Sequence, residues 1–150
     1  MSFDLSLDRG DLRINANGDL AIVENTSKLV QDSLKILHTP IGSNPFFPSL
    51  GSPITTLNVG QNLNQQFAES RIEASITKTL ETLQSIQRRQ ELIQTITPEE
   101  RIISIAEVSA ERDSQDPRQF NISVTVLSGA TDTVLLPSFS LSTTITGDNL

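Results

Sequence analysis

Residues 37–54 read L-H-T-P-I-G-S-N-P-F-F-P-S-L-G-S-P-I, and the rest of the chain is arranged around this stretch. It holds four of the chain's seven prolines and two of its seven glycines. Because proline fixes φ and lacks an N–H, and glycine accepts positive φ, the stretch predicts a loop of defined shape. Two adjacent phenylalanines, Phe46 and Phe47, would be out of place in a solvated linker. We therefore expect the loop to pack on its own domain or against a partner, with Phe46 or Phe47 as the anchor.

The segment before the loop predicts a short helix. Thr26 or Ser27 is a suitable N-cap. The helix must end before Thr39, because Pro40 moves the residue before it out of the α region. The apolar stripe that predicts the buried face consists of Leu29, Val30, Leu34, Ile36 and Leu37, and the wet face carries Lys28, Asp32 and Lys35.

The first 23 residues predict short strands. Residues 3–7 and 11–15 alternate apolar and polar side chains. The pair Asn17-Gly18 favours a type I′ turn, so residues 11–23 are interpreted as a β-hairpin, with a further turn at 8–10. The alternative is a fraying N-terminal arm.

A long helix is predicted after the loop, with Asn62 or Asn64 as its cap. Its apolar residues recur at spacings of mostly three and four. If it ran unbroken from 62 to 93 it would be about 48 Å long, more than the roughly 38 Å diameter of a domain of this size. The polar run 87–91 therefore predicts either a helix break or an overhang that touches a neighbour, and Thr97-Pro98 ends the helix. The apolar face consists of Phe67, Ile72, Ile76, Leu80 and Leu83, and the opposite face of Glu69, Glu73, Lys78 and Glu81.

The last third predicts β-structure. Residues 101–108 are rich in isoleucine, and residues 120–126 alternate strictly, as expected of a strand with one buried face within residues 119–128. A turn follows at 129–132. Residues 134–145 alternate again around Pro137, which predicts an edge strand or two short strands with a break. The fold class is thus α+β, a helical layer on a mostly antiparallel sheet. We expect one domain over 1–150, with 1–10 and 146–150 as candidate extended arms.

Composition excludes several classes of function. The formal net charge is −7, which lacks the positive footprint of a nucleic-acid binder. There is no cysteine and a single histidine, His38, so neither a disulfide framework nor a metal site is expected. No apolar run is long enough for a membrane span, and no secretory signal is visible. No phosphate loop or dinucleotide fingerprint is present, so we expect no cofactor.

Two motifs carry a resemblance to a known family. Thr39, Gly42, Pro48 and Gly51 resemble the T-x-x-G-E…P-x-x-G stretch of the baseplate wedge family of contractile phage tails, which includes phage protein W and the gene-twenty-five product. A second motif, the family's E-P-R-I signature, is matched by Glu99, Arg101 and Ile102 between the long helix and the sheet. The chain departs from the family at Ser43, where the family has glutamate, and at Glu100, where it has proline.

The resemblance implies a structural role rather than an enzyme. Members of the family sit at the tail baseplate of a virion, link wedge proteins and start the contractile sheath. The implied partners are other wedge proteins, the first ring of sheath subunits and the central hub or tube, with no nucleic acid and no membrane. The protein would be made in the host cytoplasm. The residues expected to contact these partners are Thr39, Gly42, Phe46, Phe47, Pro48, Gly51, Glu99, Arg101, Val134, Leu136, Phe139 and Leu141.

Two of these contacts have a physical rationale of their own. The Arg101 guanidinium is expected to bind a carboxylate, either Glu99 or one on a neighbouring chain, through a fork that lysine does not offer. Residues 134–145 carry no Lys or Glu that would guard a sheet edge. A sheath arm is therefore expected to add a strand there, and the alternative is that the tail closes its own sheet.

Two other functions stay open from the sequence. One is a peptidoglycan-degrading, lysozyme-like tail enzyme, because relatives have been labelled so. Glycosidases need two carboxylates at a set separation, and no spacing among the 18 acidic residues singles out such a pair. Tryptophan and tyrosine, the usual sugar platforms, are absent. His38 is expected to have a capping or surface role. A free-standing interaction domain is the third option.

Overall fold

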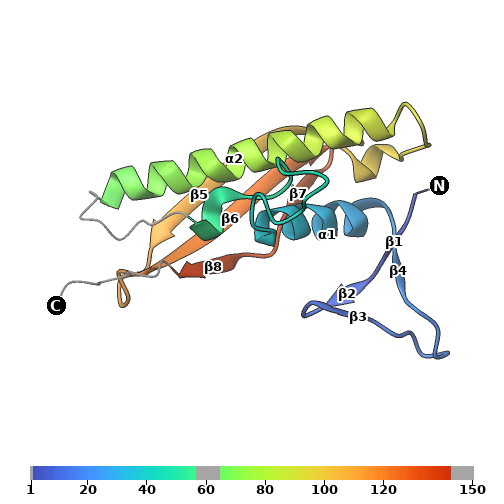
Figure 1. The fold of residues 1–150 in the computed structure, drawn as a ribbon, viewed down its shortest axis with the longest axis horizontal. Coiled ribbons are helices and arrows are strands. Elements are labelled where there is room, and N and C mark those ends of the chain that lie inside the picture. Colours follow the sequence, from blue (N-terminus) through green and yellow to red (C-terminus); the bar gives the residue numbers. More distant parts are fainter. Residues whose placement is uncertain (1, 57–64, 143–150) are drawn as a thin grey trace.

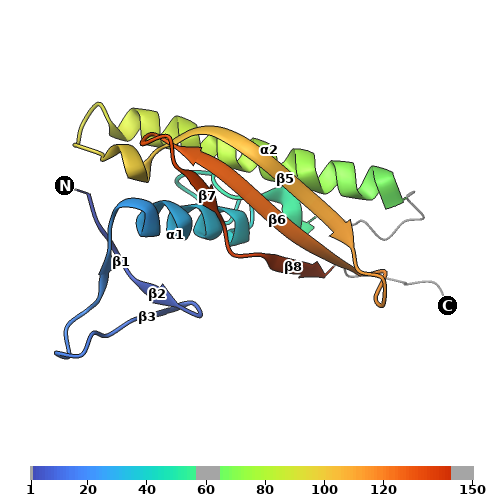
Figure 2. The ribbon, with the colours of Figure 1, turned by 180° about the vertical axis from the view of Figure 1, so that it is seen from behind.

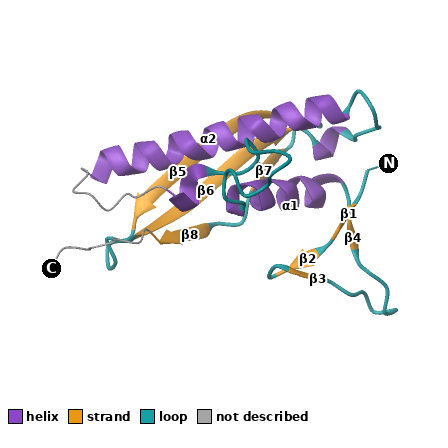
Figure 3. Cartoon of the chain, viewed as in Figure 1, coloured by secondary structure: helices purple, strands orange, loops and turns teal. Residues whose placement is uncertain are grey.

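A computed structural model describes residues 2–56 and 65–142 and confirms the α+β fold (Figures 1 and 3). Short N-terminal strands lead into two helices, and an antiparallel sheet follows them. The predicted caps Asn62 and Asn64 and the predicted arm 146–150 lie outside the described residues. In chain order the elements are β1 (Asp4–Leu5), β2 (Leu7–Asp8), β3 (Asp11–Leu12), β4 (Ile22–Val23), α1 (Asn25–His38), the 3-10 helix η1 (Pro53–Thr56), α2 (Gln65–Gln90), η2 (Pro98–Glu100), β5 (Ile102–Arg112), β6 (Gln119–Ser128), β7 (Thr133–Leu135) and β8 (Phe139–Ser142).

The C-terminal sheet is built around β6. Strand β5 pairs with one edge of β6, and β7 and β8 both pair with the other edge, near opposite ends of it. All of these pairings are antiparallel. Because Pro137 lies in the gap between β7 and β8, the prediction of two short strands with a break is confirmed. Both helices lie on one face of the sheet, and seen from behind no helix or strand of residues 2–56 and 65–142 covers the other face (Figure 2).

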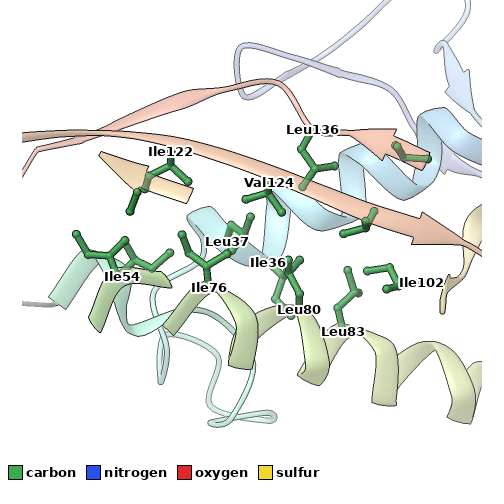
Figure 4. Packing of buried hydrophobic residues seen from close by; sticks show 14 of the residues in the cluster. Ile36, Leu37, Ile54, Ile76, Leu80, Leu83, Ile102, Ile122, Val124 and Leu136 are labelled. Carbon is green, nitrogen blue, oxygen red and sulfur yellow. The ribbon is translucent and has the colours of Figure 1, made fainter. Parts of the chain in front are cut away.

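The core lies between this sheet and the helices (Figure 4). Side chains from α1, η1, α2 and three strands meet there, including Leu37, Ile54, Ile76, Ile122 and Leu136. Helix α1 ends at His38, as the proline rule predicts. Its buried residues are Leu29, Ser33, Ile36 and Leu37, close to the predicted stripe.

The predicted face of α2 is wrong at one end. Phe67 is exposed, and its neighbour Ala68 is buried instead. The buried positions continue through Ile72, Ile76 and Leu80, each four residues after the last, so position 68 and not 67 belongs to that row. Periodicity favoured the larger apolar side chain although it lies one position off the buried row.

Helix α2 does not continue to Ile93, because it stops within the polar run 87–91, where a break was predicted. It spans 26 residues, about 39 Å, and ends at Gln90 inside the predicted polar run. The run is also not wholly solvated, because Gln87 is buried. Its side-chain amide donates to the carbonyl of Glu100 over 2.8 Å, and its carbonyl accepts the N–H of Ile102 over 2.9 Å. A polar side chain thus joins the end of the helix to the start of β5.

Residues 3–23 form a separate small unit, here called the trefoil, in which three short antiparallel pairings meet (Figure 1). Strand β1 pairs with β4, β2 pairs with β3, and Ile14 bridges Leu20. Three backbone hydrogen bonds of 2.8–2.9 Å close the junction. The N–H of Ser6 donates to the carbonyl of Ala21, that of Arg13 to the carbonyl of Ser6, and that of Ala21 to the carbonyl of Arg13. Residues 4–8 therefore pair with both of the segments that were predicted to form a simple hairpin.

The type I′ turn lies at Arg9-Gly10 and not at the predicted Asn17-Gly18. Arg9 and Gly10 both have positive φ, 52° and 84°, and join the facing residues of β2 and β3. At the other turn only Gly18 has positive φ. The Asn15 side chain accepts the N–H groups of Asn17 and Asp19 there, which widens the turn.

Candidate functional site

The loop of residues 37–54 is closed at its base. The N–H of Ser52 donates to the carbonyl of Thr39 over 2.8 Å, and the N–H of Ile41 donates to Ser52 over 3.1 Å. Gly51 is buried at this closure with φ of 116°, and a Cβ there would lie 2.6 Å from the Thr39 carbonyl oxygen. Two residues of the first motif, Thr39 and Gly51, thus meet in space and shape the loop. Gly51 itself offers no surface to a partner.

The tip of the loop presents its apolar residues to solvent. Phe46, Phe47 and Pro48 are all exposed, as is Gly42, which has φ of 81°. The loop is fastened to the core by the buried side chains of Leu37 and Ile54 at its two ends and by Leu50, which packs against the buried cluster. Phe46 and Phe47 are therefore not anchors of the fold, and a role for them as anchors in an assembly stays a prediction.

The second motif forms the junction between α2 and β5. The N–H of Gly129 donates to the carbonyl of Arg101 over 2.9 Å, and a Cβ on Gly129 would lie 3.2 Å from Nε of Arg101. Nη1 of Arg101 donates to Oε1 of Glu91, in the turn after α2. The partner is a carboxylate, as predicted, but it is Glu91 and not Glu99. The sequence did not identify Glu91, because it becomes a neighbour only when the helix ends at Gln90.

Glu100 occupies the place of the family's proline. Its side chain is buried, and neither carboxylate oxygen has a hydrogen-bond partner in the described chain. The preceding residue, Glu99, is half-buried, and no hydrogen bond of its carboxylate is found within residues 2–56 and 65–142. Its predicted role as a contact for a partner protein stays a prediction.

Helix α2 covers the outer edge of β5 with its own side chains. The carboxylates of Glu69 and Glu73 accept the N–H groups of Arg112 and Ala110, both over 3.1 Å. At the other end of the strand Gln84 donates to the carbonyls of Ile102 and Ile103. Glu69 and Glu73 were predicted on the wet face. Their spacing of four residues places them together, but nothing in the sequence shows that a strand edge lies beneath them.

The opposite edge of the sheet is formed by β7 and β8. Within the described ranges no strand pairs with either of them other than β6. Val134 and Leu136 are buried, and Phe139 and Leu141 pack partly against the core. Val134 and Leu136 therefore face inward and Phe139 and Leu141 are partly covered, so what this edge offers to a partner is its backbone together with exposed side chains such as Leu135.

The antiparallel hydrogen-bond pattern of the sheet shows which backbone N–H groups of this edge point away from β6. Because Ala110 and Arg112 direct their N–H groups to α2, their partners Ile122 and Phe120 direct their own toward β8. Phe139 and Leu141 face these residues, so the N–H of Ser140, between them, points away from β6. Ser140 is exposed.

A polar cleft of about 360 Å³ lies between the trefoil, α1 and the end of α2. It contains Asp4 and Asp32, and Nζ of Lys35 lies 2.7 Å and 3.8 Å from their carboxylates. Burial raises the pKa of Asp4, but hydrogen bonds from Lys35 and Leu5, and the charge of Lys35, outweigh it and leave that pKa below its ordinary value.

His38, the single histidine, lies at the exposed end of α1. His38 contacts the carbonyl of Leu34 through Nδ1, and its ring lies 5.0 Å from that of Phe139, which fits the expected surface role. No cluster of three or more metal-ligating side chains occurs in residues 2–56 and 65–142. Neither helix in this part of the chain is both long and apolar enough to cross a membrane.

Comparison with known proteins shows a likeness to solved structures and none to a family model or a curated protein. No family model matches the sequence. No curated protein matches it either. Among solved structures, the crystal structure of a "putative tail lysozyme" from Geobacter sulfurreducens is similar with a TM-score of 0.60. The likeness covers 81% of this chain and 93% of that chain at 12% sequence identity. The two proteins therefore share a fold.

Proposed function

We propose that this protein is a structural component of a contractile, phage-type tail. In this proposal it links wedge proteins of the baseplate and nucleates the sheath. Three observations support it: the fold shared with a protein named for a tail, the two motifs around Thr39 and Arg101, and the unequal edges of the sheet. The partners would be other wedge proteins, the first ring of sheath subunits and the central hub or tube.

The difference between the two sheet edges carries the proposal. Unpaired N–H and C=O groups along an edge are a template for another chain, and proteins normally cover or charge them. Here α2 side chains hydrogen-bond to β5, whereas β7 and β8 have neither a further strand in the described chain nor a charged residue. Strand addition would give affinity through the backbone hydrogen bonds of this edge. An extended sheath arm is the proposed added strand.

Ser140→Pro tests this step. Proline removes the outward N–H that an added strand needs and leaves the backbone hydrogen bonds between β8 and β6 in place; it also removes the exposed bond from the Ser140 hydroxyl to Oδ1 of Asn121, which Ser140→Thr can keep. We expect baseplates with this variant to form but to carry no sheath when examined by electron microscopy. Ser140→Thr is the matched control, because it keeps the N–H and favours a strand. Normal sheath on Ser140→Pro baseplates would contradict sheath nucleation at this edge.

Deleting the C-terminal segment would be a poorer test. A truncation after Asp132 removes Val134 and Leu136, which are buried in the core. Loss of each such side chain costs about 2–5 kcal/mol, so the truncated chain would report on folding rather than on strand addition.

The proposal also concerns the enzyme alternative, because we expect the protein to have no glycosidase activity. A general acid of a glycosidase needs a raised pKa, whereas the pKa of Asp4 in the polar cleft is lowered. Glu100 is the buried carboxylate without a partner, but it is not among the residues that line this cleft. A turbidity assay with purified protein and cell walls is expected to show no clearing. Clearing that is lost in Glu100→Gln or Asp32→Asn would contradict the proposal.

A further inference from the structure

An apolar groove of about 390 Å³ lies between the 37–54 loop and the last turns of α2. Its apolar lining includes Phe47 and Leu50 from the loop, and Ile86 and Ile93 from α2 and the turn after it. Arg89 also lines the groove. The groove is distinct from the β7–β8 edge, because neither of these strands contributes to it.

The apolar residues at and around the groove are unusually exposed. Phe47 is 63% exposed and Ile93 is 85% exposed, although both line the groove. Their neighbours Phe46 and Leu92 are 87% and 84% exposed. Apolar side chains gathered beside a groove mark an interaction site more often than isolated ones do. The hydrogen bonds at the base of the loop hold one wall of the groove in place, which lowers the entropy cost of binding.

The charge of the groove indicates what its partner carries. Arg88 and Arg89 are adjacent in the last turn of α2, and neither is in an ion pair with any residue of the described ranges. The carboxylate of Glu91 is already bound to Arg101. Because the chain as a whole has a net charge of −7, this basic end is a local exception. A guanidinium beside an apolar groove complements an apolar surface that bears a carboxylate.

We propose that this groove binds an amphipathic α-helix of another protein, with an aspartate or glutamate opposite Arg89. The named lining residues come from a loop, a helix and a turn, so the groove offers no strand edge on which an extended peptide could form a ladder. A helix satisfies its own backbone and places apolar side chains at i, i+3, i+4 and i+7 into such a groove. That the helix belongs to a wedge protein rests on the proposed function, whereas its chemistry follows from the groove.

A displayed library of helix-forming peptides tests the inference without knowledge of the partner. The full-length protein is the bait, and the expected winners have an apolar stripe of helical spacing with an acidic residue beside it. Phe47→Ser and Ile93→Ser should each weaken the best peptide about tenfold or more, because each removes an apolar contact. Both residues are exposed, so unchanged thermal unfolding curves would show that the variants fold.

Charge reversal sharpens the test. Arg89→Glu should shift the selected peptides from acidic to basic residues at the same position. Arg71→Glu is the matched control, because Arg71 is exposed on the same helix but does not line the groove. The inference is overturned if the winners bind the variants as tightly as the parent, if they are proline-rich or extended, or if Arg89→Glu leaves the preference unchanged.

Two further outcomes are decisive. A dimer of the protein that is lost in Ile93→Ser would show that a second copy fills the groove, and it would overturn the inference. Failure of the sheath experiment at Ser140 would contradict the proposed function and leave the groove result standing. Peptide binding as expected, with normal sheath on Ser140→Pro baseplates, would therefore separate the two ideas.

Discussion

The four-stranded sheet and the trefoil share an alternating pattern of apolar and polar residues, but only the sheet buries its apolar face. In β6 the alternating residues Phe120, Ile122 and Val124 are all buried. In the trefoil the facing pairs Leu7 with Leu12 and Ile14 with Leu20 are also apolar, yet all four side chains are exposed. The sheet has two helices against one face, whereas the trefoil lies beyond them (Figure 1). An alternating pattern selects a strand, and a second layer decides whether its apolar face is buried.

The attachment of the trefoil differs in kind from the packing of the sheet. Gln31 of α1 donates to the carbonyl of Leu5 over 2.8 Å and accepts the N–H of Leu7 over 2.9 Å. Lys35 of the same helix pairs with Asp4. These links are polar and partly exposed, so they contribute little to global stability. We therefore expect the trefoil to open locally, at lower free energy than the sheet and helices.

The largest expected effect is in the core of the sheet. Phe120→Ala should lower the free energy of unfolding by about 3–5 kcal/mol, because it leaves a cavity between β6 and the helices. Phe3→Ala is the matched change beside β1, where the side chain is 60% exposed, and it should alter stability by no more than about 0.5 kcal/mol. Denaturant unfolding of both variants checks this. Similar losses would mean that Phe3 is buried in solution and that the two regions do not differ.

A glycine pair sharpens the same comparison. Gly51→Ala places a Cβ 2.6 Å from a backbone oxygen, so overpacking of about 1–3 kcal/mol adds to the roughly 1–2 kcal/mol of a positive φ. Gly10 in the trefoil has φ of 84° with nothing within 4 Å of the added Cβ. Gly10→Ala should therefore lower the free energy of unfolding only by the roughly 1–2 kcal/mol of a positive φ. Thermal and denaturant unfolding measure both, and equal costs would show that the loop closure yields to the extra methyl group.

The order of elements was predictable because it rests on short-range patterns. Pro40 ends α1, Pro137 separates β7 from β8, and the strict alternation of residues 120–126 indicates β6. What failed were local choices settled by packing. Phe67 was assigned to the buried row that Ala68 occupies, and Asn17 was given a positive φ that the Asn15 side chain makes unnecessary.

The candidate sites were predictable to a smaller degree. The residue types of the loop showed that it is shaped, and Thr39 and Gly51 do meet at its base. The partner of Arg101 was missed, because Glu91 comes close to Arg101 only when α2 ends at Gln90. The covered edge of β5 was missed for a similar reason, since the carboxylate of Glu73 bonds to a strand 37 residues away. Contacts between distant elements leave no periodic signal in a single sequence.

Substitution of two glutamines tests whether burial or hydrogen bonding accounts for the difference in stability between the core and the trefoil. Each side chain bonds to both a backbone N–H and a carbonyl, Gln87 in the core and Gln31 at the trefoil. Gln87→Leu should cost about 1–3 kcal/mol, because it leaves buried backbone groups unpaired. Gln31→Leu should barely change global unfolding, because water can replace the lost bonds, but it should speed hydrogen exchange at Leu7. Equal global losses would contradict the local opening of the trefoil.

The smallest expected effect is the pH dependence of the link between Asp4 and Lys35. The pKa of Asp4 is lowered in the folded protein, so the link contributes stability above the ordinary aspartate pKa of 3.8 and loses it as pH falls through the folded value. The attachment of the trefoil should therefore be constant from about pH 7 to 5 and weaken below about pH 4. Because Lys35 is 46% exposed, the effect should be well under that of a buried pair.

NMR signals of Leu5 and Leu7, followed against pH, measure this pH dependence. Lys35→Met should move the change at Leu5 to higher pH, because Lys35 helps to lower the pKa of Asp4, whereas Asp113→Asn, which removes another carboxyl of lowered pKa in the β5–β6 loop, should leave it in place. If the signals shift in the parent and in Lys35→Met alike, the trefoil is held by something other than this ion pair.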